Sequence, residues 1–208
     1  SAVKIQKMFL DIVHKYWKIK KFKSIYFCSQ MHGFILLDKN NGLLSDYITW
    51  QDERSLEVEK NGTDLYSQIV KELKNEFKEI TGMKPLPSLP FFNAIKYCCD
   101  LKIIGKVKII TLADWFSVAG KDVKHLTHDT LFAGLGFYDI KRKTISPKLL
   151  KLSKKYTGCD FTFNEVTNDC SKISGYVKSG AIKIPMYVGV GDQQCALFGA
   201  DIRLDLDL

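Results

Sequence analysis

The stretch that most constrains what this chain can fold into is 184–200, IPMYVGVGDQQCALFGA. Its apolar start predicts a short buried strand, and the small and apolar residues at its end are typical of a helix packed against a sheet. Gly189 and Gly191 lie between these parts, and Asp192 follows directly. The pattern therefore places a carboxylate at the carboxyl end of a strand, where open α/β sheets bind their ligands.

Asp192 has two interpretations at this point. The two preceding glycines leave no side chain in the way of a closely approaching ligand, which favours a functional carboxylate. An aspartate in the first turn of a helix is equally typical of a simple cap. The motif alone leaves both interpretations open.

The other periodic stretches predict alternating strands and helices, and hence an α/β fold. The predicted helices are 3–18, 65–80, 91–101, 111–118 and 147–157, and the predicted strands are 24–28, 34–37, 47–54 and 108–110. Residues 125–140 mix small, polar and aromatic side chains, so we expect a loop that lines a site. Residues 201–208 alternate apolar and charged side chains and predict the start of a further strand.

Charge and composition narrow the classes of protein. The formal net charge is +8 with scattered lysines, which suits a solvated lysine face or an anionic ligand such as a nucleotide. No arginine-rich stripe or aromatic RNA-binding signature is present, so we expect no nucleic-acid partner. No apolar run is long enough to span a bilayer, and no signal peptide is seen. The six cysteines lack zinc or disulfide spacing, so most are expected to be buried thiols of a cytoplasmic protein.

Polar residues follow three predicted strand ends, at 30–32, 50–54 and 192–193. Strand ends of one sheet converge on one crevice, so we expect these residues to meet. They supply amides, an imidazole and carboxylates, but no serine or cysteine nucleophile with an evident base. Such a set suits a polyhydroxyl ligand and one general base that takes the proton of an attacking alcohol.

Simpler interpretations of the same residues stay open. His32 also fits a core histidine bonded to a carbonyl, and Trp50 fits ordinary packing. Asp52 and Arg54 are two residues apart, which fits an ion pair that organises a turn. The two histidines and the aspartate within 125–129 lack a further ligand nearby, so no metal site is predicted.

At these motifs the chain resembles the FGGY carbohydrate kinases. The stretches that carry the resemblance, in the same order and spacing, are 30–33 (QMHG), 49–54 (TWQDER), 111–115 (TLADW), 135–139 (LGFYD) and 191–199 (GDQQCALFG). The resemblance implies an actin-like ATPase fold of the ribonuclease H type and an ATP-dependent sugar kinase. The first two motifs are similar to the ketose branch, the xylulokinases and sedoheptulokinases.

The resemblance also implies roles for individual residues. Asp192 would be the catalytic base that takes the proton of the sugar hydroxyl. Phe91 falls about where glycerol kinases place a tyrosine that touches the substrate, and Asp52 would mainly build the pocket wall. The full set of substrate-binding residues that the resemblance implies is Gln30, Met31, His32, Asp52, Phe91 and Gln193.

Two parts of the family pattern are missing from this sequence. Family members begin with a strand carrying an Asp-x-Gly-Thr-Thr phosphate loop, and no such motif occurs here. We therefore expect 1–200 to be a partial N-terminal domain and 201–208 to start the linker strand into an absent nucleotide-binding domain. ATP and Mg²⁺ would be bound mainly by parts outside this chain, which would be inactive alone. Without the first strands of the family pattern, sheet edges would be left unpaired, and two chains could pair through them as a homodimer.

Two other functions remain alternatives at this stage. One is a non-catalytic sugar-binding module that lacks the nucleotide half. The other is a basic nucleic-acid-binding domain, whose binding would depend strongly on salt. The sugar itself is not predicted, because hydroxyl stereochemistry is recognised by the geometry of the pocket.

Overall fold

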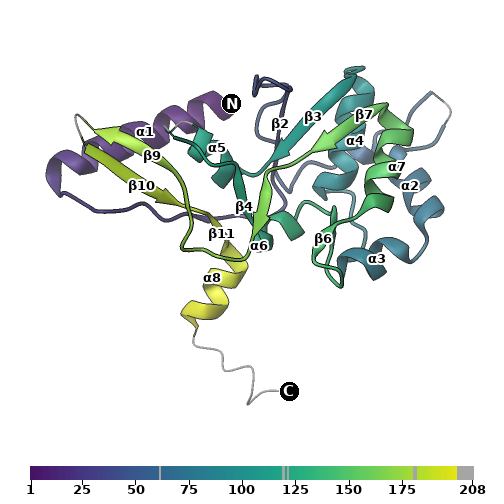
Figure 1. Cartoon of the computed structure of the whole chain (residues 1–208). Coiled ribbons are helices and arrows are strands. Elements are labelled where there is room, and N and C mark those ends of the chain that lie inside the picture. Colours follow the sequence, from purple (N-terminus) through teal and green to yellow (C-terminus); the bar gives the residue numbers. More distant parts are fainter. Residues whose placement is uncertain (61, 119, 121, 180–181, 201–208) are drawn as a thin grey trace, which may run out of the picture.

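The computed structural model describes residues 1–60, 62–118, 120, 122–179 and 182–200. Helices and strands alternate along much of the chain, which confirms the predicted α/β class (Figure 1). The α-helices are α1 (Ala2–Ile19), α2 (Leu65–Leu73), α3 (Glu76–Thr81), α4 (Pro90–Asp100), α5 (Leu112–Val118), α6 (Asp129–Ala133), α7 (Pro147–Thr157) and α8 (Asp192–Gly199). The strands are β1 (Cys28–Ser29), β2 (Ile35–Leu37), β3 (Gly105–Ile110), β4 (Leu126–His128), β5 (Tyr138–Asp139), β6 (Thr144–Ile145), β7 (Cys159–Thr162), β8 (Glu165–Thr167), β9 (Ile173–Ser179), β10 (Ile182–Tyr187) and β11 (Val190–Gly191).

A sheet of β2, β3 and β7 separates two apolar cores. β2 pairs antiparallel with β3, which pairs parallel with β7. Leu36 and Ile109 face the larger core, which also holds side chains from α2, α3, α4 and α7. Ile35 and Ile110 face a smaller core with Trp115 of α5. Successive strand residues point to opposite faces, so both faces of this sheet are covered.

A second layer brings together the ends of β1 and β11, which precede residues 30–32 and Asp192. Residues 25–29 run parallel to 186–191 through β1 and β11 and through the bridge between Ile25 and Met186. β9 and β10 form an antiparallel hairpin beside them, and α1 lies along this hairpin in Figure 1. Trp17 of α1 belongs to the same buried cluster as Met186, which fixes the helix on this layer.

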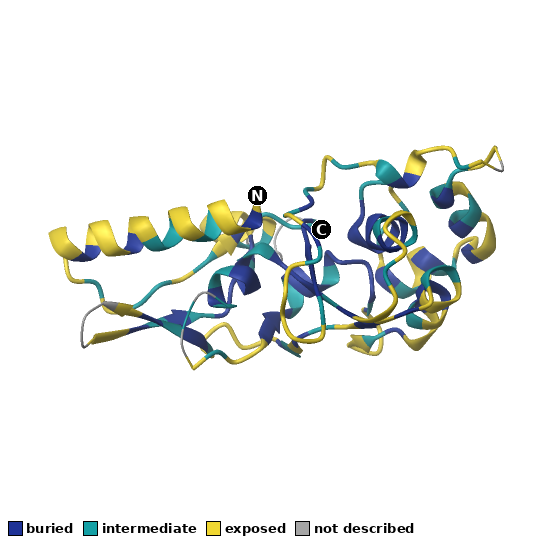
Figure 2. Ribbon diagram, turned by 90° about the horizontal axis from the view of Figure 1, so that it is seen from above, coloured by how far each residue is buried: buried dark blue, intermediate teal, exposed yellow. Residues whose placement is uncertain are grey.

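The amphipathic helix predicted over 3–18 is confirmed by α1, although its apolar face is only partly covered. Val13 and Trp17 are buried, whereas Met8, Ile12 and Tyr16 are 54%, 53% and 56% exposed. Figure 2 shows exposed residues along the outer side of this helix. No helix in the described part of the chain is both long and apolar enough to cross a membrane.

Two helix starts have the predicted capping chemistry. Ser146 Oγ accepts a hydrogen bond from the Leu149 amide at 3.4 Å, and Gly158 ends the same helix, α7, with a left-handed φ of 75°. At the start of α5, Asp114 Oδ2 accepts the Thr111 amide at 2.8 Å, and Thr111 Oγ1 accepts the Asp114 amide at 3.3 Å. This reciprocal pair is a capping box.

Other expectations differ from the structure. The helix predicted over 65–80 is two helices, α2 and α3, because Lys74 takes a φ of 50° and ends the first one. Strands β7 to β9 were not predicted, although Cys159–Thr162 alternates buried and exposed residues. All six cysteines are free and only Cys98 and Cys159 are buried, so the expectation that most are buried is wrong. The strand predicted over 201–208 lies outside the described residues.

Candidate functional site

Asp192 lies at the predicted junction of strand and helix. β1 pairs parallel with β11, and α8 begins directly after β11, with Asp192 as its first residue. The side chain is exposed, and Oδ1 accepts a hydrogen bond from the Gln193 amide at 2.9 Å. Oδ2 makes no hydrogen bond to the described residues. One carboxylate oxygen thus bonds the amide of the next residue in the first turn of α8, whose N-cap is Gly191, and the other is not used by a described residue.

Gly189 and Gly191 serve the packing of the protein itself. A Cβ at Gly189 would lie 2.4 Å from the Cβ of Ala113, and a Cβ at Gly191 would lie 2.4 Å from Oε1 of Gln194. The Gly191 amide also donates to Thr130 Oγ1 at 3.1 Å. We expected these glycines to clear a path for a ligand. Instead they let α5 and α8 approach the strand, and so they fix where α8 begins.

His32 is anchored by one ring nitrogen. Its φ is 61°, in the left-handed region that non-glycine residues rarely adopt. Nδ1 lies 2.9 Å from the carbonyl oxygen of Gly134, so we assign the hydrogen to Nδ1, which donates it. In the neutral ring Nε2 is then an acceptor. The carbonyl bond considered from the sequence is present, yet one nitrogen remains for a ligand.

A cavity of about 600 Å³ connects the two strand ends. This volume is in the range of small-molecule sites. The lining combines residues after β1 with residues at the start of α8, which the sequence led us to expect together. The lining residues are Gln30, Met31, His32, Trp50, Met83, Lys84, Leu86, Ser88, Leu89, Asp192 and Gln193.

The loop 83–89 forms a wall of the cavity that the sequence analysis missed. It connects α3 to α4 and contributes Met83, Lys84, Leu86, Ser88 and Leu89. Pro85 and Pro87 lie within this loop and Pro90 follows it, so its backbone is stiff. The feature that could have predicted this wall is a rigid loop between two helices that carries a lysine and a serine, since binding residues often lie on such loops. Lys84 and Asp192 are the charged residues of the described lining.

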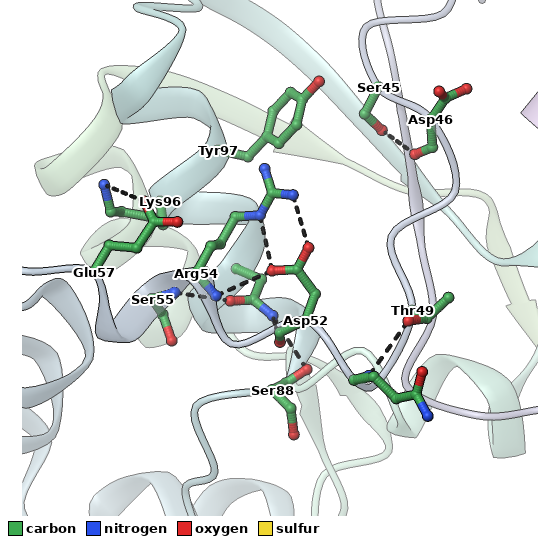
Figure 3. A network of polar contacts seen from close by, with 12 residues as sticks. Ser45, Asp46, Thr49, Asp52, Arg54, Ser55, Glu57, Ser88, Lys96 and Tyr97 are labelled. Carbon is green, nitrogen blue, oxygen red and sulfur yellow. Dashed lines mark hydrogen bonds and ion pairs between the residues drawn. The ribbon is translucent and has the colours of Figure 1, made fainter. Parts of the chain in front are cut away.

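Asp52 is not among the lining residues, and its carboxylate is occupied by Arg54. Arg54 Nε and Nη2 donate to the two oxygens of Asp52 at 2.9 and 2.7 Å (Figure 3). This guanidinium lowers the pKa of the Asp52 carboxyl. The predicted role of Asp52 as a sugar ligand is therefore corrected to the alternative, an ion pair that organises a turn. The same turn exposes Trp50, which is 49% exposed and does line the cavity.

Phe91 is likewise away from the cavity. Its ring is completely buried, with centroids 5.1 Å from Phe92, 5.4 Å from Phe77 and 5.0 Å from Phe137. The second residue of α4 points into this aromatic core, whereas Leu89, just before the helix, reaches the cavity. The predicted contact between Phe91 and substrate is corrected to core packing.

Residues 125–140 support the site from behind. They form β4, α6 and β5 and do not line the cavity, which corrects the expectation of a lining loop. Thr127 donates through Oγ1 to Asp114 Oδ2 at 2.8 Å, and burial raises the pKa of the Asp114 carboxyl to about 6. His128 pairs with Asp129 at 3.1 Å. The described part of the chain holds no group of three histidine, cysteine or acidic side chains suited to a metal ion.

Comparison with known proteins finds a domain family that spans nearly the whole chain. A family model described as the N-terminal domain of the FGGY family of carbohydrate kinases matches residues 4–199. No curated protein matches the chain. The family match covers all of the residues that line the cavity.

Solved structures share the fold. A ligand-bound xylulose kinase from Lactobacillus acidophilus superposes with a TM-score of 0.73 at 20% identity, covering 97% of this chain and 41% of that one. A Plasmodium falciparum glycerol kinase with ADP gives 0.72 at 19%, covering 96% and 41%. A gluconate kinase from L. acidophilus gives 0.65 at 21%, covering 90% and 39%. The fold is the actin-like one, and the chain spans about two fifths of the length of these structures.

Proposed function

This chain belongs to the FGGY family of carbohydrate kinases, and from that premise we propose that it forms the sugar site of an ATP-dependent ketose kinase. The observation that supports the proposal is the cavity shared by Gln30, Met31 and His32 with Asp192 and Gln193. It combines hydrogen-bonding groups with a single carboxylate, which is the set that phosphorylation of a sugar hydroxyl requires.

Asp192 is the general base in this proposal. A sugar hydroxyl has a pKa far above 7, so its oxygen attacks phosphorus well only when a partner accepts the proton as the bond forms. Asp192 Oδ2 is free for that proton, since Oδ1 already accepts the Gln193 amide. The hydroxyl oxygen bonds to the transferred phosphoryl group, the bond from that phosphorus to ADP breaks, and the proton stays on the carboxyl.

Three side chains hold the sugar. His32 accepts a hydroxyl hydrogen through Nε2, because Nδ1 is bound to Gly134. Gln193 bonds a further hydroxyl from the start of α8, and the exposed face of Trp50 packs against C–H groups of the ring. Met31 fills the apolar part of the wall.

ATP and Mg²⁺ are held elsewhere in this proposal. ATP supplies the phosphoryl group, and Mg²⁺ neutralises its charge. The described residues hold no cluster of three histidine, cysteine or acidic side chains suited to a metal ion. In this proposal the chain contributes sugar binding and proton transfer.

The test uses the complete gene product. ATP-dependent phosphorylation of xylulose and of sedoheptulose is measured by ADP release, and binding of each sugar is measured by calorimetry. Saturable turnover with either sugar supports the proposal. Sugar binding without turnover would favour a non-catalytic sugar-binding module instead, and the absence of both would overturn the sugar site.

A further inference from the structure

Tyr47 lies behind the cavity wall and contacts a residue that lines it. Gln30 Nε2 donates to the Tyr47 hydroxyl oxygen at 2.9 Å. The backbone next to Tyr47 is fixed, because Ile48 and Phe34 exchange both of their amide hydrogen bonds at 2.9 Å. Tyr47 itself is not among the cavity-lining residues.

Gly33 makes the contact between Tyr47 and Gln30 possible. A Cβ at position 33 would lie 2.1 Å from the Tyr47 hydroxyl oxygen and 2.5 Å from Cζ of its ring. No side chain fits there while the phenol stays in place. The glycine that ends the QMHG motif therefore gives the phenol its path to the first residue of that motif.

The contact also determines which end of the Gln30 amide is available. An amide side chain has one NH₂ group and one carbonyl oxygen. With Nε2 directed to Tyr47 inside the wall, Oε1 is the group left for the cavity. Burial and the charge of Asp192 both raise the pKa of the Tyr47 phenol, so the hydroxyl stays neutral at physiological pH.

We propose that Tyr47 is a positioning residue that orients the Gln30 amide so that its carbonyl oxygen accepts a hydroxyl of the sugar. This inference rests on the proposed sugar site and extends it to a residue that does not touch the substrate. The Tyr47 ring also packs against the core of Ile35 and Trp115, so a purely structural role is the alternative that the test must exclude.

Tyr47→Phe isolates the hydroxyl, because it keeps the ring. We expect the KM and the calorimetric Kd for the sugar to rise about fivefold, the effect of one lost hydrogen bond, with kcat within about twofold. Tyr156→Phe is the matched control: its hydroxyl donates to Glu72 Oε2 at 3.0 Å, and neither residue lines the cavity. That variant keeps the wild-type KM.

A double-mutant cycle separates positioning from structure. If Tyr47 acts through Gln30, then Tyr47→Phe adds nothing to Kd in a Gln30→Ala background. An additive effect, or a lower melting temperature with unchanged Kd, would overturn the proposal. Because Kd is measured without turnover, a protein that binds sugar but does not phosphorylate it still tests Tyr47. A wild type that binds neither sugar overturns both proposals.

Discussion

The two walls of the cavity are held in different ways. On one wall, His32 is bonded to Gly134 and Gln30 is bonded to Tyr47, so both side chains are oriented before any ligand arrives. On the other wall, Asp192 begins α8, none of whose residues is buried. The first wall is thus preorganised for binding, whereas the second presents one carboxylate with little packing around it. Changes at His32 and Gln30 on the first wall should alter affinity, and a change at Asp192 on the second should alter the rate.

The largest effect is expected from Asp192→Asn. Loss of a general base lowers kcat by roughly 10²- to 10⁴-fold, while the preorganised wall keeps the sugar Kd within about threefold. Because the side chain is exposed, the melting temperature should not change. Single-turnover kinetics and calorimetry on the same preparation check both parts. A wild-type rate in this variant would remove Asp192 from the base role.

Asp114 tests the buried support behind the cavity, because its carboxylate joins Thr111, just after β3, to Thr127 in β4. Burial raises the pKa of the Asp114 carboxyl to about 6 in the folded chain, from an ordinary value of 3.8. The folded state therefore binds the proton more tightly, and the stability contributed by Asp114 falls as pH rises from about 4 to about 6, by at most about 3 kcal/mol. Urea unfolding across this window should show the fall in the wild type, relative to Asp114→Asn. If the unfolding free energies of the two proteins changed in parallel with pH, this expected loss of stability would be contradicted.

Gly189→Ala addresses the packing of α5 against the segment that leads to Asp192. The new Cβ would meet Ala113 at 2.4 Å, so unfolding free energy should drop by about 2 kcal/mol from overpacking. Gly199→Ala, at the end of α8, is the control, since no atom lies within 4 Å of its Cβ position. Denaturant titration compares them. Equal stability of both variants would mean that the strand accommodates the extra carbon.

His32→Ala gives the smallest of these effects and distinguishes the walls most directly. Removing the acceptor should raise the sugar KM about tenfold, equivalent to one well-placed hydrogen bond, with little change in kcat. His14→Ala is the control, because His14 is exposed on α1 and its ring nitrogen Nε2 lies 3.2 Å from the Lys178 carbonyl oxygen. A larger loss in kcat than in KM would place His32 in the chemical step instead.

Local chemistry made part of this molecule predictable. Neighbouring residues determine the amphipathic pattern of α1 and the serine cap and closing glycine of α7. They also determine the strand and glycine before α8 and the aspartate that begins it. The same patterns predicted that Asp192 and residues 30–32 lie together, and they line one cavity. The family match then agreed with the resemblance carried by these motifs.

Tertiary contacts decided what the sequence could not show. The apolar spacing continues across Lys74, although the backbone turns there and splits one predicted helix into two. The motifs predicted that Asp52 and Phe91 contact the substrate. In the structure the Arg54 guanidinium binds the Asp52 carboxylate, and the aromatic core encloses Phe91. Tyr47 was not found, because its contact with Gln30 depends on the missing side chain of Gly33.

The bond from the Gln193 amide to Asp192 makes the two carboxylate oxygens chemically unequal. If Asp192 is the base, as proposed, the oxygen that accepts no amide hydrogen is the one left to take the sugar proton. Only a hydroxyl arriving on the side of that oxygen would then be deprotonated, whichever other hydroxyls the bound molecule displays. A single main-chain hydrogen bond would thereby contribute to regioselectivity, ahead of any contact that distinguishes one sugar from another.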